Sequence, residues 1–440
     1  MKYNKGIVSI KRRIDTKYDK ELEQYLIDNC LYRNEIYNDF VEAVNKFEQN
    51  GNPISDFSPR NYATFYYNEI ERLNPLYNYY ASGIRAKVSS DIHDNIRIVL
   101  RDRYKYNRND ILLKKKDYDP FYMSFSFENK REERRIFYSA KTRIFSPYEI
   151  YITFNKQKVM YPILLKEQLL SDKTPTLDKN GDLWYYEKHE KYIFREKDIK
   201  EIIFIYDLGH FYICIVTKVK FLKSNKDKHA IGTAGIDMGI HNPLTIYDGS
   251  SYYIERMDIK TLDTIKRLEE RSARLKEILQ MKYDENMKKV KLGLIDSPYS
   301  NNYRKVQHKL RITNRKIHNI RRNWILQTSN KIVNDYDTIV VDNFLQPVNG
   351  YSYTKKMKQM NYDNRNHAMY DFNQTLQYLS KKYYCNYIKS PENTTRTCSI
   401  CGYINEKLVL SERYLKCKKC GYIIDRDMNA SKNCFDYISD

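Results

Sequence analysis

Two Cys-x-x-Cys pairs constrain this chain more than any other feature of its sequence. Cys398 and Cys401 form the first pair, Cys417 and Cys420 form the second, and fifteen residues separate them. Gly-Tyr follows each pair, and a glycine at that place permits the tight turn of a zinc knuckle. Four thiolates complete a tetrahedral zinc site and leave no open position for catalysis. The spacing therefore predicts one structural zinc ion in a small ribbon over residues 391–424.

The other cysteines lack the spacing of ligands, and most of them are expected to be buried apolar side chains. They are Cys30, Cys214, Cys385 and Cys434. Paired ligands rather than a disulfide framework are typical of a reducing compartment. The N-terminal sequence MKYNKGIVSIKRR has no apolar signal core, and no segment approaches the ~18 apolar residues of a membrane helix. We expect a cytoplasmic protein without a membrane partner, associated with the nucleoid when bound to DNA.

The charge balance predicts an anionic partner. The 440 residues include 77 Lys and Arg against 56 Asp and Glu, which gives a formal net charge of +21. Nucleic acid is the leading candidate. A basic protein that neutralises its phosphates releases counterions, and this gives affinity that does not depend on the base sequence. A basic protein that is merely well solvated has the same composition. The net charge alone therefore does not distinguish these two interpretations, and candidate catalytic or metal-binding residues are needed as well.

The N-terminal half predicts a β domain interrupted by helices. Runs of β-branched and aromatic residues alternate with Lys, Asp, Asn and Gly over 120–225, which indicates mostly antiparallel strands. A short strand at 6–12 could belong to the same β domain. Between this strand and the others, the chain has apolar residues at helical spacing. We therefore assign residues 1–15 and 115–225 to the β domain and 16–114 to a helical lobe. The helices are expected at 17–48, 61–73 and 80–106.

Several arginines on predicted helices are candidates for contact with phosphates, although a solvated helix face would look the same. These are Arg85, Arg97, Arg101, Arg311, Arg315, Arg321 and Arg322. The ribbon carries further cations that could face nucleic acid, among them Arg396, Arg413, Lys416, Lys418 and Lys419.

The C-terminal half places three aspartates in an ordered pattern. Three strands begin near Gly232, with Asp237 ending the first; two helices and a strand followed by Asp342 come next. A further helix and strand precede the ribbon, and Asp427 opens a terminal helix. This is the element order of an RNase H-like fold, in which the first and fourth strands are neighbours. A lone Asp is more typical of a cap or turn, but this order predicts an α/β domain over 232–390 and 425–440, with the ribbon inserted.

Three converging carboxylates cannot all be ionised without a cation between them. Two Mg²⁺ or Mn²⁺ ions, ~3.5–4 Å apart, relieve this repulsion and suit hard oxygen ligands. One ion activates water against a phosphodiester and the other stabilises the leaving oxygen. The pattern therefore predicts a phosphodiesterase site made of Asp237, Asp342 and Asp427.

The segments that carry these residues resemble a known family. GIDMGIHNPLTIYDG, TIVVDNF and TCSICGY…LKCKKCGYIIDRDMNASKN are similar to the RuvC-like nuclease core and zinc ribbon of the transposon-encoded TnpB family. They also resemble its relatives, the miniature type V CRISPR effectors. The resemblance covers 232–440, and its most specific part is the ending CxxCG…DRDxNAxxN. The N-terminal half matches only in layout, as a β wedge domain that carries a helical recognition lobe.

The resemblance implies an RNA-guided DNA endonuclease. Its partners would be a structured guide RNA and double-stranded target DNA next to a short recognised motif. The protein would act as a monomer or as a homodimer on one guide RNA. A single RuvC-like site of Asp237, Asp342 and Asp427 would cut with Mg²⁺, and Asp425 would cap or support the site.

One position departs from the family pattern. Asp342-Asn343-Phe344 stands where the family usually has Glu-Asp-Leu. An Asp carboxylate reaches about 1 Å less far, and a misplacement of that size can cost ~100-fold in rate. The alternative is a cleavage-impaired RNA-guided DNA-binding protein that acts as a repressor or roadblock. A basic zinc-ribbon protein that binds RNA without guidance is a third hypothesis, but it has no use for three converging acids.

Overall fold

The computed structural model consists of two units, Lys5–Lys220 and Phe221–Asp440 with the first residues of the chain. We call them the N-terminal unit and the C-terminal unit and describe each by itself. The structure describes residues 4–17, 19–76, 79–81, 83–116, 119–128, 149–153, 160–168, 176–177, 183–187, 192–195, 198–222, 232–239, 242–342, 369–390, 392–406 and 412–438. Parts of the β domain expected over 120–225, among them residues 129–148, lie outside these residues.

The helices of the N-terminal unit are α1 (Lys20–Gln49), α2 (Pro59–Tyr66) and α3 (Ile84–Tyr106). The side chain of Asp19 caps α1 by accepting a hydrogen bond from the Leu22 amide. α3 starts later than expected, because Gly83 precedes it in a left-handed conformation with φ 92°. The single helix expected at 61–73 is instead α2 followed by a π-helical turn, η2 (Tyr67–Glu71). This turn buries Glu71, which pairs with Arg85 and accepts a hydrogen bond from the Tyr32 hydroxyl.

The sheet of the N-terminal unit has seven strands in the order β2-β8-β9-β7-β6-β5, with β1 also paired to β9. Their bounds are β1 (Lys5–Arg13), β2 (Tyr122–Glu128), β5 (Thr176–Leu177), β6 (Leu183–Glu187), β7 (Tyr192–Arg195), β8 (Ile199–Asp207) and β9 (His210–Phe221). A separate hairpin joins β3 (Glu149–Thr153) to β4 (Met160–Leu164). Because β1 pairs antiparallel with β9, α1 to α3 are inserted between two strands of one sheet.

The C-terminal unit is built on a five-stranded sheet in the order β12-β11-β10-β13-β14. Its strands are β10 (Thr233–Asp237), β11 (Leu244–Tyr247), β12 (Tyr252–Glu255), β13 (Thr338–Val341) and β14 (Asn386–Lys389). The first three are antiparallel neighbours, whereas β10, β13 and β14 run parallel. The adjacency of the first and fourth strands agrees with the prediction from the element order.

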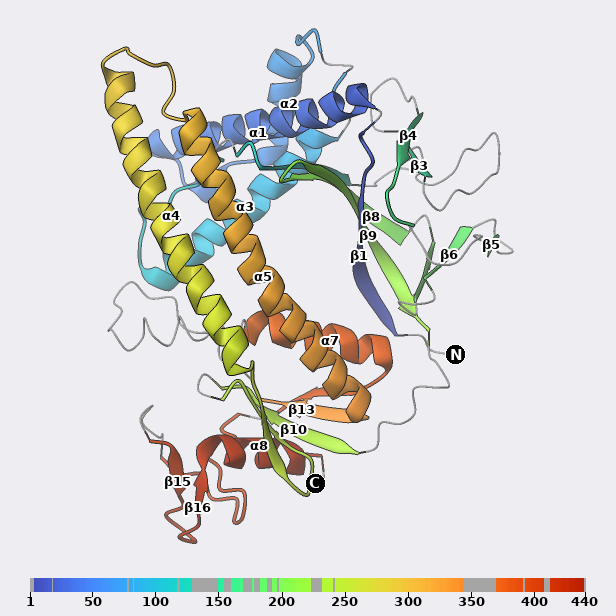
Figure 1. Ribbon diagram of the computed structural model, residues 1–440, viewed down its shortest axis with the longest axis vertical. Coiled ribbons are helices and arrows are strands. Elements are labelled where there is room, and N and C mark those ends of the chain that lie inside the picture. Colours follow the sequence, from blue (N-terminus) through green and yellow to red (C-terminus); the bar gives the residue numbers. More distant parts are fainter. Residues whose placement is uncertain are drawn as a thin grey trace. The chain divides into compact units, whose positions relative to one another are not determined.

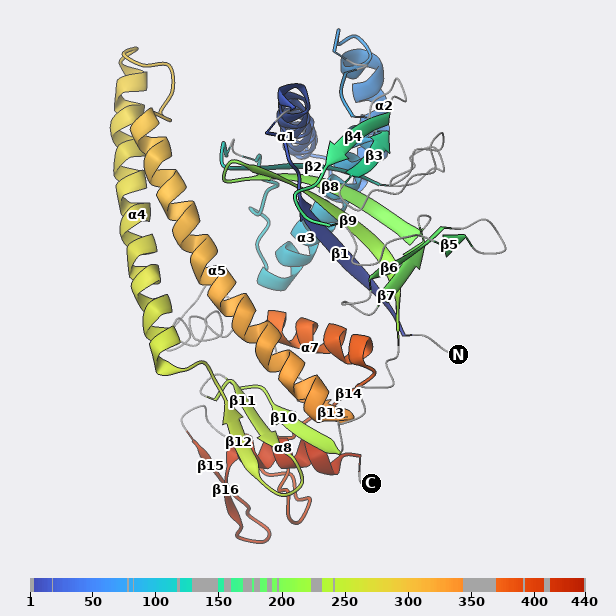
Figure 2. The same ribbon diagram turned by 45° about the vertical axis from the view of Figure 1, so that its right-hand side comes forward.

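Helices cover both faces of this sheet (Figure 1). Ala234 and Ile236 point into an apolar core that includes residues of α5 (Asn301–Asp335) and α7 (Met369–Tyr383). Gly235, between them on β10, faces the other way and contacts α8 (Arg426–Asp436). α4 (Ile259–Lys291) and α5 form a long antiparallel hairpin that both ribbon views show side by side (Figure 2).

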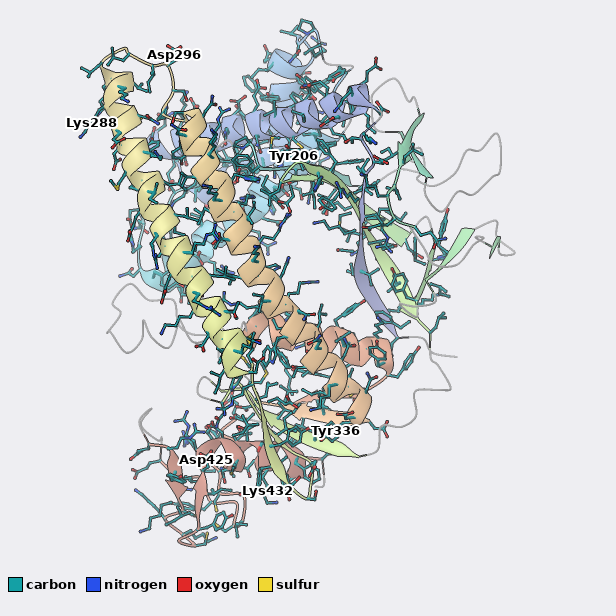
Figure 3. The ribbon with its side chains drawn as sticks, viewed as in Figure 1. Tyr206, Lys288, Asp296, Tyr336, Asp425 and Lys432 are labelled. Carbon is teal, nitrogen blue, oxygen red and sulfur yellow. The ribbon has the colours of Figure 1, made fainter. Side chains whose placement is uncertain are left out.

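Figure 3 shows Lys288 and Asp296 at the far end of this hairpin. Its seam combines apolar contacts of Ile265 and Ile317 with a hydrogen bond from Ser272 Oγ to Asn314 Oδ1.

Among the described residues, none of the helices combines the length and the apolar character that a membrane span needs.

Candidate active site and metal centre

The parallel pairing of β10 and β13 brings two of the predicted aspartates to one edge of the sheet. Asp237 is the last residue of β10, and Asp342 directly follows β13. The backbone N–H of Asp342 donates to the Ile236 carbonyl at 2.8 Å, which continues the ladder past the end of the strand. Both carboxylates therefore start from adjacent backbone positions.

The terminal helix delivers the third aspartate. Asp425 is the N-cap of α8, and its side chain accepts hydrogen bonds from the backbone N–H groups of Asp427 and Met428. α8 lies so close to β10 that a Cβ on Gly235 would be 2.0 Å from the Ser431 carbonyl oxygen. Only glycine tolerates this approach, which packs α8 closely against β10, and Asp427 Oδ2 would lie 3.6 Å from a Cβ on Gly239, just past the end of that strand. Figure 3 shows Asp425 at the start of this helix and Lys432 farther along it.

Burial and mutual repulsion mark the three carboxylates as one cluster. Asp237 and Asp427 are 5% and 4% exposed. Burial raises the pKa of the Asp237 carboxyl well above its ordinary range, and the negative charges of Asp342 and Asp427 raise it further. The guanidinium of Arg426 opposes this shift. Asp237 therefore lies within electrostatic reach of both other predicted acids, and the catalytic role of the three stays a prediction.

Two hydroxyl groups hold the Asp342 carboxylate. Ser390 Oγ and Thr394 Oγ1 both donate to Asp342 Oδ1, at 3.0 and 2.8 Å. Ser390 follows β14, the parallel neighbour of β13, so the sheet places it beside Asp342. Sequence reasoning missed both hydroxyls, and the position of Ser390 after a strand was the one available signal.

Arg413 is one of the ribbon cations that the sequence predicts could face nucleic acid. Its guanidinium instead contacts Asp425 Oδ2 through Nε and Asp427 Oδ2 through an Nη atom, each at 2.8 Å. The pairing of β15 (Tyr414–Lys416) with β16 (Ile423–Asp425) explains this, because it carries the residue before β15 to the start of α8.

The four cysteines of the predicted ribbon converge in space. Their sulfur atoms all lie within 4.8 Å of one another. Cys401 and Cys417 are 3.5 Å apart, and Cys398 and Cys420 are 3.7 Å apart. A tetrahedral site with Zn–S bonds of about 2.3 Å requires sulfurs about 3.8 Å apart, whereas a disulfide requires about 2.05 Å. The cluster therefore fits a zinc ribbon, as the spacing predicted.

Backbone amides favour the thiolate form of Cys417, one ligand of the second knuckle. The backbone N–H of Cys420 lowers the pKa of the Cys417 thiol to about 6, against the opposing effect of desolvation. A thiol with this pKa is largely ionised at neutral pH, which is the form that binds zinc.

The arginines predicted to contact nucleic acid occupy different environments. Arg85 pairs with Glu71, Arg101 with Asp102 and Arg321 with Glu269. Arg97 and Arg322 are exposed, whereas Arg311 and Arg315 are half-buried. Arg85 and Arg321 are therefore held by carboxylates of the protein itself. Contact of any of the seven with nucleic acid stays a prediction.

Comparison with known proteins assigns the end of this unit. Residues 370–434 match the family model described as Cas12f1-like, TNB domain. The matched segment begins in α7, spans the four cysteines and ends in α8, so it contains the ribbon and Asp427. The predicted resemblance to miniature type V CRISPR effectors is thereby confirmed for this part of the chain. A comparison with curated proteins found no match.

Solved structures similar to the whole chain include a Cas12f1–sgRNA–target DNA complex. The two chains share 16% identity, with a TM-score of 0.31, over 98% of this chain and 99% of that one. The mini-RNA-guided endonuclease CRISPR-Cas_phi3 shares 11% identity, with a TM-score of 0.36, over 99% and 92% of the two chains. C2c1 of Alicyclobacillus acidoterrestris in complex with single-guide RNA shares 9%, with a TM-score of 0.34, over 94% and 70%. TM-scores this low carry no argument about function.

Proposed function

We propose that this chain is an RNA-guided DNA endonuclease with a RuvC-like active site. The observation that carries the proposal is the meeting of Asp237, Asp342 and Asp427 at one edge of the β10–β13 sheet. The match of residues 370–434 to a Cas12f1-like domain supports it independently. The geometry supports phosphodiester hydrolysis, and the domain match supports the guided form of that reaction.

The donor set of the acid cluster fits hard divalent cations. Three carboxylates supply only oxygen atoms, which suits Mg²⁺ or Mn²⁺ better than zinc. Burial raises the pKa of Asp237 most, and the negative charges of Asp342 and Asp427 raise it further, so a bound cation would favour its ionised form. Two bound cations would activate water and stabilise the leaving oxygen of a phosphodiester. Asp237 and Asp342 would hold them from the sheet, and Asp427 from α8.

The other residues of the site orient these ligands. Asp425 fixes the first turn of α8 through its cap, and Arg413 joins Asp425 to Asp427. Arg413 lies beside the carboxylates, where its positive charge can also attract a phosphate. The zinc ribbon would have no catalytic role, because four thiolates leave no open coordination position.

The proposed partners are a guide RNA and double-stranded target DNA. Base pairing with the guide would read the sequence, as in related effectors. Residues 1–15 and 115–225 would form the wedge domain, 16–114 the recognition lobe, and 232–390 with 425–440 the nuclease domain around the ribbon at 391–424. The net charge of +21 supports contact with many phosphates.

A reprogramming experiment tests this function. RNA that co-purifies with the full chain is sequenced, and its variable segment is replaced by a chosen sequence. With Mg²⁺, the complex should cut plasmid DNA at the complementary site and not at a scrambled one. Asp237→Ala should abolish cutting and retain guided DNA binding. Cutting that ignores the guide, or that survives Asp237→Ala, would refute the proposal.

The cleavage-impaired alternative rests on Asp342 in the place of the usual Glu. The hydroxyls of Ser390 and Thr394 already bind the shorter side chain at hydrogen-bond distance. A longer side chain would displace the carboxylate by about 1 Å, so we expect Asp342→Glu to slow guided cleavage by about 10- to 100-fold. Rates are measured under single-turnover conditions. A rate increase of tenfold or more would favour the guided repressor or roadblock.

A further inference from the structure

Two buried hydroxyl groups bind the same oxygen of Asp342. Ser390 is 8% exposed and Thr394 is 3% exposed, and both donate to Oδ1. The Asp342 carboxylate therefore cannot rotate without breaking two hydrogen bonds in a site with little access to water. Loss of such a bond in a buried site is costly, because water does not replace it.

Two asparagines of α8 hold the segment that carries Thr394. Asn429 Nδ2 donates to the carbonyl oxygens of Thr394 and Thr397, at 3.1 and 2.7 Å. Asn433 Nδ2 donates to the same two carbonyls, at 2.6 and 2.7 Å. The asparagines are four residues apart, so they lie on one face of the helix. They are the two asparagines of the DRDxNAxxN ending.

The same segment leads directly into the first zinc knuckle. Thr397 precedes Cys398, and the backbone N–H of Ser399 donates to Asn429 Oδ1 at 3.0 Å. Helix α8, the segment 394–397 and the knuckle are thus one hydrogen-bonded assembly. Asp427 lies on the same helix, two residues before Asn429. The assembly therefore connects two of the three acids, Asp342 and Asp427, to the ribbon.

We propose that Thr394 and Ser390 are positioning residues that hold Asp342 for divalent cations, and that Asn429 and Asn433 keep Thr394 in place. The inference rests on the proposed function, since it gives Asp342 the role of a metal ligand. It explains how an Asp can serve at this position, because its partners are placed for the shorter side chain. It also makes the ribbon part of the geometry of the acid site.

Divalent-cation affinity tests the hydroxyls directly. Mn²⁺ is titrated into the zinc-loaded full chain without nucleic acid, and free Mn²⁺ is followed by electron paramagnetic resonance. Removing a group that orients a metal ligand typically weakens binding 10- to 100-fold, so we expect Thr394→Val to raise the Mn²⁺ Kd by about tenfold or more. Thr394→Ser retains the hydroxyl and should restore most of the affinity. Thr264→Val, which removes a hydroxyl bound to the Lys260 carbonyl on α4, is the matched control.

The asparagines are tested through the same readout. Asn433→Leu touches none of the acids but removes two hydrogen bonds from the Thr394 segment, and it should weaken Mn²⁺ binding about tenfold. Asp436→Asn alters the next turn of α8, where Asp436 pairs with Lys432, and should leave the Kd unchanged. Zinc content and circular dichroism verify folding. If Thr394→Val does not fold, Ser390→Ala takes its place with the same expectation.

The outcomes separate this inference from the proposed function. Mn²⁺ binding that Asp237→Asn removes, but that Thr394→Val and Asn433→Leu leave unchanged, would overturn the positioning role alone. Mn²⁺ binding that Asp237→Asn leaves unchanged would overturn the nuclease proposal together with this inference. Weakening by Thr394→Val, rescued by Thr394→Ser, supports both.

Discussion

Asp237 is the residue whose environment has the clearest physical consequence. Its carboxylate is buried beside two other acids, and a group so placed is more easily protonated in the folded chain than in the unfolded chain. The folded state then binds more protons than the unfolded state between the ordinary pKa of Asp and the raised one. Metal-free stability should therefore fall as pH rises through this interval, and divalent cations should restore it.

Substitution of Asp237 by Asn removes the buried negative charge that lowers the metal-free stability. In Mg²⁺-free buffer at pH 7, Asp237→Asn should unfold at a higher temperature than the wild type. Wild-type chain should gain about 2.7 kcal/mol when Mg²⁺ exceeds its Kd 100-fold, whereas the variant should gain nothing comparable. Thermal unfolding between pH 4 and 8, with and without Mg²⁺, measures both effects. A wild-type stability that rises with pH over this interval would contradict the assignment.

Helix α8 is the element on which the site depends most. It caps on Asp425, supplies Asp427 and lies against β10 at a distance that only a glycine permits. Its other partners are carbonyls that lead to the zinc knuckle. A change in how this helix packs should therefore alter stability and cation binding together.

Gly235→Ala is the sharpest test of the helix packing. The new Cβ would lie 2.0 Å from the Ser431 carbonyl and 2.4 Å from the Phe435 amide nitrogen, and both are backbone atoms that cannot rotate away. We expect at least the ~1–3 kcal/mol typical of overpacking, together with a loss of Mg²⁺-dependent stabilisation. Denaturant unfolding measures the first and thermal shifts the second. Gly209→Ala has φ +84° and no neighbour within 4 Å, so it should retain the Mg²⁺ effect.

The ribbon should exist only with its metal. A zinc site of this kind contributes roughly 10–16 kcal/mol in isolated zinc-finger peptides, and this segment has little other core. Cys417→Ser should therefore lose zinc and, through the segment 394–397, weaken Mn²⁺ binding about tenfold. Elemental analysis and Mn²⁺ titration provide the two readouts. Cys214→Ser lies outside the cluster and should keep its zinc; retention of zinc by Cys417→Ser would contradict the four-thiolate site.

The whole molecule is dominated by its positive charge. If a chain with a net charge of +21 binds RNA and DNA as proposed, it must release many counterions on binding. Its affinity should therefore depend more on salt than on any single contact. This distinguishes a nucleic-acid-binding protein from one that is only well solvated.

A salt titration measures how strongly the affinity for nucleic acid depends on salt. If six to ten phosphates are neutralised, affinity for guide RNA should fall about 10³- to 10⁵-fold between 50 and 200 mM salt. Arg322 is exposed on α5, so Arg322→Ala should lower the slope of log K against log salt by about one, whereas Arg322→Lys should preserve it. Filter binding over a salt series measures the slope. A flat dependence would argue against the proposed partners.

Local pattern and chain spacing were sufficient for much of the C-terminal unit. The cysteine spacing predicted the four-sulfur cluster, and the strand order predicted that β10 and β13 are adjacent. Asp237 and Asp342 could be placed because each follows directly from its own strand. Such features depend on residues close in sequence or on the few ways in which strands and helices can be connected.

Packing alone determined the partners of these residues. Ser390 and Thr394 reach Asp342 across 48 and 52 residues, and Arg413 turns to the acids rather than to solvent. Arg85 and Arg321, which resembled surface cations in the sequence, pair with Glu71 and Glu269. A hydrogen bond or ion pair forms only where two side chains arrive within about 3 Å of each other, and residue spacing along the chain does not specify distances at that precision.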